Sequence, residues 1–152
     1  MLPLTLDGHR VSTMDRKLKE VAAKLNIENI LTKRTYEVSG GQAQRTAIAR
    51  AIIHSPLLLL ADEPTGNLDS KAAKDVMELF EKINRDTGVT TVMVTHDSKS
   101  ASYCHRVIFI KDGQFFNEIH RGDSRQKFCQ QIIDVLSLFG GETNDIFSIG
   151  PK

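Results

Sequence analysis

The chain has 152 residues, of which 40% are hydrophobic and 26% are charged, and its formal net charge at pH 7 is +1. This length is sufficient for one globular domain with its own core, whereas the near-neutral charge lacks the basic excess typical of nucleic-acid-binding proteins. No apolar run approaches the roughly 20 residues of a membrane span, and the two cysteines match no disulfide or metal pattern, which favours reduced thiols in the cytosol.

The first predicted element is an amphipathic helix that follows Ser12 and Thr13, two residue types that often cap helices. Its apolar residues recur at helical spacing among charged ones: Leu18, Val21, Ala22 and Leu25. One further turn is expected near Ile30. A second helix is expected after Ser39, with an apolar face of small residues that permits close packing: Ala43, Ala47, Ile48, Ala51 and Ile52.

Strands and helices alternate along the central part of the chain. We expect a strand over residues 57–61, a helix over 70–85, a strand over 89–95, a short helix over 97–103 and a strand over 107–110. This alternation predicts a parallel sheet that helices cover on both faces. Because residues 57–61 form a continuous apolar run, we expect a central strand that is buried on both sides.

The long central helix and the segments after it have clear local signals. The helix over residues 70–85 carries one apolar stripe and two pairs spaced as exposed ion pairs: Ala72, Val76, Leu79 and Ile83, with Lys71/Asp75 and Glu78/Lys82. Lys111-Asp112-Gly113 predicts the tight turn of an antiparallel hairpin at the end of the sheet, with its second strand over 114–119. Asp123 and Ser124 predict the cap of a last helix, whose inward residues run from Phe128 to Phe139 before a frayed tail.

Ser39-Gly40-Gly41-Gln42 begins the second helix and has the S-x-x-Q form of a capping box, which is worth on the order of 1 kcal/mol. A capping box does not explain two glycines in the first helical turn, where each costs about 0.8–1 kcal/mol relative to alanine. Glycines lack the Cβ atoms that would keep an anion from the free N–H groups, and the helix dipole favours negative charge there. From these residues alone, anion binding and simple capping both stay open.

Two acids, Asp62 and Glu63, close the apolar strand at the end where open α/β sheets gather ligands. Consecutive residues of an extended chain point to opposite faces, so the two acids should have different tasks. One can hold Mg²⁺, commonly through water, and the other can align or deprotonate an attacking water. The alternative is that both acids only solvate the strand end.

His96 follows the next apolar strand, which is expected to lie beside the strand of the two acids. At that position its imidazole can donate a hydrogen bond to a phosphate oxygen. Asp97 is interpreted as the cap of the following helix. The other histidines are interpreted as structural: His9, His54, His105 and His120.

These motifs together resemble the ATP-binding-cassette ATPases over roughly residues 2–119. The matching segments, in order, are Val38-Ser39-Gly40-Gly41-Gln42, Gln44-Arg45, Ala47-Ile48-Ala49-Arg50-Ala51, residues 57–64, Thr65-Gly66-Asn67-Leu68-Asp69 and Thr95-His96-Asp97. The resemblance implies cofactor-binding roles in the signature motif for Ser39, Gly40, Gly41 and Gln42. It further implies that Asp62 is the Walker B magnesium residue, Glu63 the catalytic carboxylate, Asp69 the D-loop acid and His96 the switch histidine.

The implied fold class is α/β, a partial P-loop NTPase-like domain with a parallel sheet flanked by helices and an N-terminal helical signature subdomain. The expected parts are that subdomain over residues 1–54, an α/β core with Walker B, D-loop and switch histidine over 55–122, and a C-terminal helix and tail over 123–152. The 152 residues contain no Walker A loop of the form G-x-x-x-x-G-K-[ST]. We therefore expect the sequence to be the C-terminal portion of a longer subunit.

The resemblance implies an ABC transporter subunit that binds and hydrolyses ATP with Mg²⁺. The sequence is most similar to the exporter branch of lipoprotein-releasing, macrolide-efflux and bacitracin-resistance systems, which move peptides, lipoproteins or drugs. The implied partners are a second ATP-binding subunit, arranged head to tail, and an integral membrane permease, without nucleic acid. The implied location is cytoplasmic, at the inner face of the cell membrane. The chain alone is expected to be inactive, because hydrolysis needs the phosphate cradle and its lysine.

Two other classes of protein stay open at this point. The first is a non-enzymatic interaction or regulatory module that pairs through an exposed sheet face, since lost strands leave apolar surface and unpaired edges. The second is a soluble DNA-repair-type ATPase, which shares the signature and Walker B motifs. The absence of a long heptad pattern and of a basic surface disfavours the second class.

Overall fold

The computed structural model describes the backbone of residues 11–145 and the side chains of residues 11–138. The chain forms two compact units, Met1–Val94 and Thr95–Lys152. The predicted divisions near residues 54 and 122 do not coincide with this boundary and stay a prediction. In the described part of the chain, no helix combines the length and the apolarity that crossing a membrane requires.

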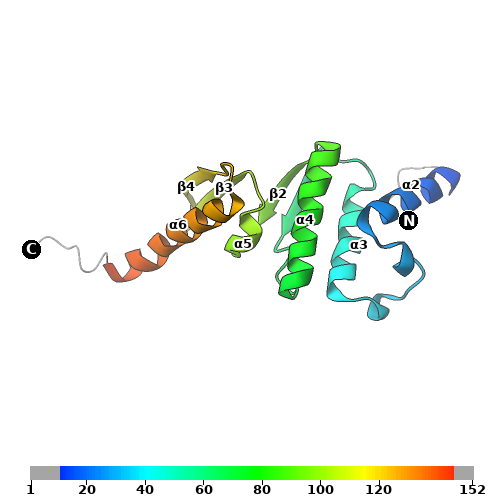
Figure 1. Ribbon diagram of the computed structural model, residues 1–152, viewed down its shortest axis with the longest axis horizontal. Helices are drawn as coiled ribbons and strands as arrows, with labels where there is room; N and C mark the ends of the chain where they lie inside the picture. The colour runs from blue at the N-terminus through cyan, green and yellow to red at the C-terminus, as the bar shows by residue number, and fades with distance from the viewer. Residues whose placement is uncertain (1–10, 146–152) are drawn as a thin grey trace, which may run out of the picture. The chain divides into compact units, whose positions relative to one another are not determined.

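The first unit contains a parallel β-α-β arrangement preceded by helices (Figure 1). Its elements are α2 (Val11–Leu25), the short 3-10 helices η1 (Glu28–Ile30) and η2 (Thr35–Glu37), α3 (Gly40–Ile52), β1 (Leu58–Asp62), α4 (Ser70–Thr87) and β2 (Thr90–Val94). β1 and β2 pair in parallel from Leu58 opposite Thr90 to Asp62 opposite Val94. Both strands therefore end at the same edge of the sheet, as predicted.

Two details of the N-terminal helices differ from the sequence prediction. Ser12 and Thr13 do not cap α2, because the helix already includes both residues. The buried face of α3 contains Ile48 and Ala49, whereas its small residues Ala43, Ala47 and Ala51 are exposed. Periodicity alone placed the apolar stripe on a neighbouring face, because alanine is compatible with either environment.

Helix α4 covers one face of the two-stranded sheet (Figure 1). It begins after the N-cap Asp69 and ends at Gly88, whose φ of 70° is the left-handed conformation that glycine adopts readily. Three residues of the predicted stripe are buried, Val76, Leu79 and Ile83, together with Met77 and Phe80, whereas Ala72 is half-buried. The predicted ion pairs are replaced by others, since Glu78 pairs with Lys74 at 3.7 Å and Asp75 pairs with Arg45 at 3.2 Å.

The opposite face of this sheet is open, contrary to the prediction of a strand buried on both sides. The side chains on this face, which we call the open sheet face, are Leu58 (51% exposed), Leu60 (71%), Val92 (50%) and Val94 (62%). Leu59, on the other face, is only 5% exposed. The difference arises because α4 covers only one face of β1, and an apolar run does not determine which elements pack on each side of a strand.

The second unit is a hairpin packed against a helix. It contains α5 (Ser98–Ala101), β3 (Arg106–Lys111), β4 (Gln114–His120) and α6 (Arg125–Asp145). Asp112 and Gly113 join β3 to β4 with φ values of 51° and 76°, so the predicted tight turn is confirmed. The hairpin forms a sheet separate from that of β1 and β2, rather than the end of one sheet.

The core of the second unit lies between α6 and the hairpin, with α5 alongside. It is formed by Ala101, Phe109, Phe128 and Ile132, against which Val135 and Leu136 also pack. Ser124 Oγ accepts a hydrogen bond from Lys127 N at 3.3 Å, which supports the predicted cap. Helix α6 continues to Asp145, past the predicted end near residue 139, although two glycines follow that position.

Candidate nucleotide site

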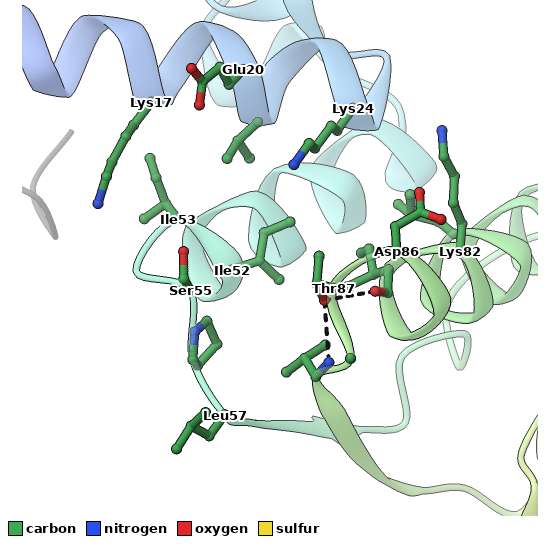
Figure 2. A pocket seen from close by; sticks show the side chains of 16 residues that line it. Lys17, Glu20, Lys24, Ile52, Ile53, Ser55, Leu57, Lys82, Asp86 and Thr87 are labelled. Carbon is green, nitrogen blue, oxygen red and sulfur yellow. Dashed lines mark hydrogen bonds between the residues drawn. The ribbon is translucent and has the colours of Figure 1, made fainter.

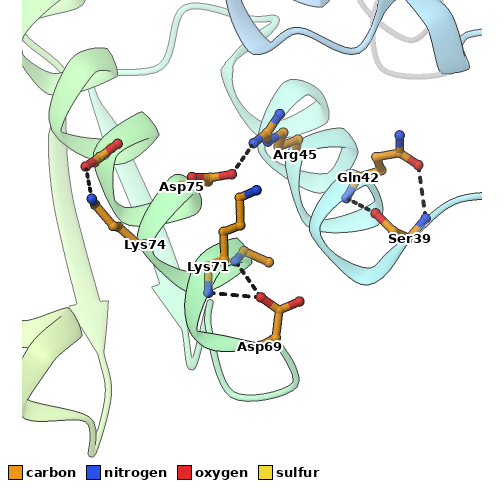
Figure 3. A network of polar contacts seen from close by, with 9 residues as sticks. Ser39, Gln42, Arg45, Asp69, Lys71, Lys74 and Asp75 are labelled. Carbon is orange, nitrogen blue, oxygen red and sulfur yellow. Dashed lines mark hydrogen bonds and ion pairs between the residues drawn. The ribbon is translucent and has the colours of Figure 1, made fainter.

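The predicted signature segment forms an exposed helix start. Ser39 Oγ accepts the Gln42 N–H at 3.3 Å and Gln42 Oε1 accepts the Ser39 N–H at 3.0 Å, which confirms the capping box (Figure 3). Ser39 and Gly40 are exposed, and Gly41 is half-buried. The positive end of the α3 dipole therefore faces solvent at Ser39–Gly41, which we call the signature tip.

The two glycines of the signature tip also allow α3 to approach the start of α4. A Cβ atom added to Gly40 would lie 3.2 Å from Leu68 Cδ2, and one added to Gly41 would lie 3.3 Å from Ala72 Cβ. Both distances are shorter than ordinary van der Waals contact. Close packing is thus a second physical reason for these glycines, besides the anion approach inferred from the sequence. Sequence spacing gave no signal of it, because the contacts join segments about 30 positions apart.

Asp69 has a definite structural role next to the signature tip. Its Oδ1 accepts the N–H groups of Lys71 and Ala72, both at 2.9 Å, so the carboxylate caps α4 (Figure 3). The side chain is exposed. Asp69 directly follows Leu68, whose Cδ2 would lie 3.2 Å from a Cβ atom on Gly40, so Asp69 and the signature tip are near each other in the first unit. A role for Asp69 toward nucleotide stays a prediction.

The two acids that follow the leucine run differ in backbone conformation. Asp62 is exposed at the end of β1, opposite Val94, whereas Glu63 has a φ of 42°. The prediction that both residues are extended and alternate across the sheet is therefore wrong for Glu63. The Glu63 N–H donates to Val94 O at 2.9 Å and its carbonyl accepts from Gly66 N at 3.1 Å. These bonds hold Glu63 in a left-handed conformation that a residue with a Cβ rarely adopts.

Glu63→Gly is expected to raise the free energy of unfolding by about 1 kcal/mol, because glycine tolerates positive φ. Urea unfolding followed by circular dichroism measures this difference. Glu78→Gly is the matched control, because this exposed glutamate lies inside α4, where glycine costs about 1 kcal/mol. Equal destabilisation by both changes would contradict strain at Glu63.

The donor set at the β1 edge fits a Mg²⁺ ion that retains most of its water. Asp62 offers one exposed carboxylate. Among the described residues, no group of three or more His, Cys, Asp or Glu side chains is arranged to enclose a metal. Mg²⁺ is usually bound by one or two carboxylates together with water and substrate phosphates, and it does not need a cage made of protein ligands alone. The single carboxylate of Asp62 therefore fits this ion.

His96 belongs to the second unit, where it lines a cavity of about 240 Å³ together with Asp97, Phe109 and Ile132. Asp97 caps α5, as predicted, by accepting from Ser100 N at 2.9 Å and from Lys99 N at 3.3 Å. Partial burial raises the pKa of Asp97, but the hydrogen bonds from Ser100 and Lys99 outweigh it and hold the pKa below its usual value. A common site for His96 with the two acids of the first unit stays a prediction.

A separate groove of about 270 Å³ lies between α2 and the C-terminal ends of α3 and α4 (Figure 2). Its lining combines aliphatic residues with charged ones: Ile52, Ile53 and Ile83, with Lys17, Glu20, Lys24, Lys82 and Asp86. The signature tip and Asp69 lie at the other ends of these helices, about 20 Å away along the 13 residues of α3. This groove is therefore distinct from the predicted nucleotide site.

Comparison with known proteins agrees with the sequence resemblance. The family described as ABC transporter matches residues 4–66. The ABC transporter ATP-binding protein YxdL of Bacillus subtilis is 66% identical over 149 residues, which cover 98% of this chain and 58% of that protein. The chain belongs to the ABC transporter ATP-binding family. Another family member, the bacitracin export ATP-binding protein BceA of Halalkalibacterium halodurans, is 48% identical over 146 residues, covering 95% of this chain and 58% of BceA.

Solved structures of the family support the fold class. The dimeric post-hydrolysis state of the ATP-binding cassette MJ0796, bound to ADP and Pi, aligns with a TM-score of 0.64 and 37% identity. That alignment covers 75% of this chain and 50% of the cassette. The chain thus spans between 50% and 58% of the length of these relatives. The predicted α/β class with a parallel sheet and flanking helices is confirmed.

Proposed function

We propose that this chain is part of a subunit that hydrolyses ATP for an exporter, at sites shared by two subunits arranged head to tail. The observation that carries the proposal is the common edge of β1 and β2, where Asp62 lies opposite Val94 and the Glu63 N–H bonds to Val94 O. Two acids are thereby fixed at the carboxyl ends of parallel strands, where α/β proteins bind ligands. Membership of the ABC transporter ATP-binding family supports the same conclusion.

Three residues would act on the nucleotide of their own subunit. Asp62 would hold Mg²⁺ through its exposed carboxylate, and the ion would neutralise charge that develops on the phosphates. Glu63 would align and deprotonate the attacking water, for which its fixed backbone is well suited. His96 would donate a hydrogen bond to a phosphate oxygen.

The signature tip would serve the nucleotide of the opposite subunit. Its exposed helix start presents N–H groups and the positive end of the dipole, which favour a γ-phosphate. Gln42 holds the turn through the capping box, and Asp69 lies near the tip. One chain would therefore contribute to two sites in a pair of subunits, and the dimeric state of the cassette MJ0796 supports this arrangement.

The similarity to BceA, whose name specifies bacitracin export, supports an exporter of peptides, lipoproteins or drugs. In such a system the subunit would work with an integral membrane permease at the inner, cytoplasmic face of the cell membrane. Substrate choice would then belong to the permease, and this chain would supply free energy from ATP.

The proposal is tested by comparing the chain with a chimera, in which the part of YxdL that lies outside the alignment is fused to this chain. We expect no Mg²⁺-dependent ATP hydrolysis from the 152 residues alone, because they contain no phosphate-binding Walker A loop. The folded chimera is expected to hydrolyse ATP, measured as phosphate release. Hydrolysis by the chain alone that disappears on Glu63→Gln would contradict the expected inactivity, and a folded but inactive chimera would contradict the proposed function.

The open sheet face favours a second candidate, a non-enzymatic interaction module. Its four aliphatic side chains are at least half exposed, and such apolar patches commonly mark association sites. In this case the chain would form constitutive oligomers whose size does not depend on ATP, as measured by light scattering after size exclusion. Leu60→Lys should then restore the monomer, whereas Leu138→Lys, a change at an exposed leucine of α6, should not. A monomeric parent chain would end this candidate.

A further inference from the structure

An ion pair joins the helix of the signature tip to the helix that Asp69 caps. Arg45 NH2 lies 3.2 Å from Asp75 Oδ2, and the two side chains are 25% and 41% exposed (Figure 3). Each residue follows the cap of its own helix by six positions, Arg45 after Ser39 and Asp75 after Asp69. The pair therefore ties α3 to α4 at corresponding levels, about 9 Å along each helix from its start.

The same two helices also touch nearer their starts. A Cβ atom on Gly40 or Gly41 would lie only 3.2 Å from Leu68 Cδ2 or 3.3 Å from Ala72 Cβ, so each glycine permits a close approach there. A steric contact at one level and an ion pair at the next level together restrict both sliding and splaying of α3 against α4.

We propose that Arg45 and Asp75 are positioning residues that lock the signature tip and the Asp69 loop into one rigid element. The importance of this element rests on the proposed function, in which both groups face a second subunit. A preorganised surface loses less conformational freedom on association, so fixed spacing between the tip and Asp69 favours pairing of the subunits. The ion pair matters here for spacing more than for stability, since partly exposed pairs usually contribute less than about 1 kcal/mol.

The test uses amide hydrogen exchange of the 152-residue chain, followed residue by residue by NMR without nucleotide. Arg45→Gln is expected to accelerate exchange of the capped amides Gln42 and Ala72 about threefold, the effect of one weak ion pair. Exchange of Val76 and Phe80, which are buried in α4, should not change. Arg50→Gln is the matched control, because Arg50 is exposed on the same helix.

A double change distinguishes a working pair from two independent side chains. Asp75→Asn should give the same threefold acceleration, and Arg45→Gln with Asp75→Asn together should give no more than either alone. The proposal would be overturned by additive effects of the two changes or by unchanged exchange at Gln42 and Ala72. Equal acceleration at Val76 and Phe80 would also overturn it, since that result indicates general destabilisation. Because no nucleotide is present, this result is independent of whether the chimera hydrolyses ATP.

Discussion

Glu63→Gln in the chimera is expected to lower the rate of ATP hydrolysis by about 10²–10⁴-fold, the usual contribution of a positioned general base. Glutamine has nearly the same shape as glutamate, so the left-handed backbone at φ 42° and the hydrogen bond to Val94 can persist. What disappears is the basic oxygen that accepts a proton from water. The measurement is steady-state phosphate release at saturating Mg²⁺ and ATP.

The control for this change is Glu78→Gln, which removes an exposed carboxylate from α4 at some distance from the strand ends. Its hydrolysis rate should match that of the parent chimera. ATP binding by the Glu63→Gln chimera, measured with a fluorescent nucleotide, should stay within about twofold of the parent, because a group acting mainly in the transition state lowers the rate with little effect on ground-state binding. Unimpaired hydrolysis would remove Glu63 from its proposed role.

Phe128→Ala is expected to destabilise the second unit by about 3–5 kcal/mol, the usual cost of removing a buried phenylalanine side chain. Phe128 is 1% exposed and lies in the core with Phe109 and Ile132. Its removal leaves a cavity between α6 and the hairpin, which a unit with so few core residues cannot readily refill. Urea unfolding monitored by the NMR signals of β3 and β4 measures the change.

Phe115→Ala is the comparison for the core substitution. Phe115 lies in β4 of the hairpin and is 68% exposed. Its replacement should therefore change the free energy of unfolding by less than about 0.5 kcal/mol. Similar losses at the two positions would show that the described core does not stabilise the unit. A loss confined to Phe128 would confirm that α6 and the hairpin fold together.

Local structure was predictable where short-range chemistry determines it. The capping box of Ser39 and Gln42 involves atoms three residues apart, and the Asp112-Gly113 turn needs two positive φ values that these residue types tolerate. The stripe of α4 was also recovered, because its large aliphatic residues can be buried on only one side. In each case the information lies within one element of the chain.

The remaining features depend on contacts between elements. Asp75 pairs with Arg45, 30 positions away, although Lys71 is at suitable helical spacing. The packing of Gly41 against Ala72 and the left-handed conformation of Glu63 likewise follow from how α3, α4 and β2 meet. Residue type gave the candidate site residues through family resemblance, but it gave no sign of the second reason for the glycines. An exposed sheet face was expected only for the alternative of an interaction module, from the missing part of the family pattern and not from the leucine run.

The open sheet face has a thermodynamic consequence for whatever covers it. Covering its leucine and valine side chains transfers apolar surface out of water, and such a transfer carries a negative change in heat capacity. The enthalpy of that association therefore becomes more favourable on warming. Calorimetry at several temperatures thus distinguishes an occupant of this face from a ligand held mainly by polar groups at the helix starts.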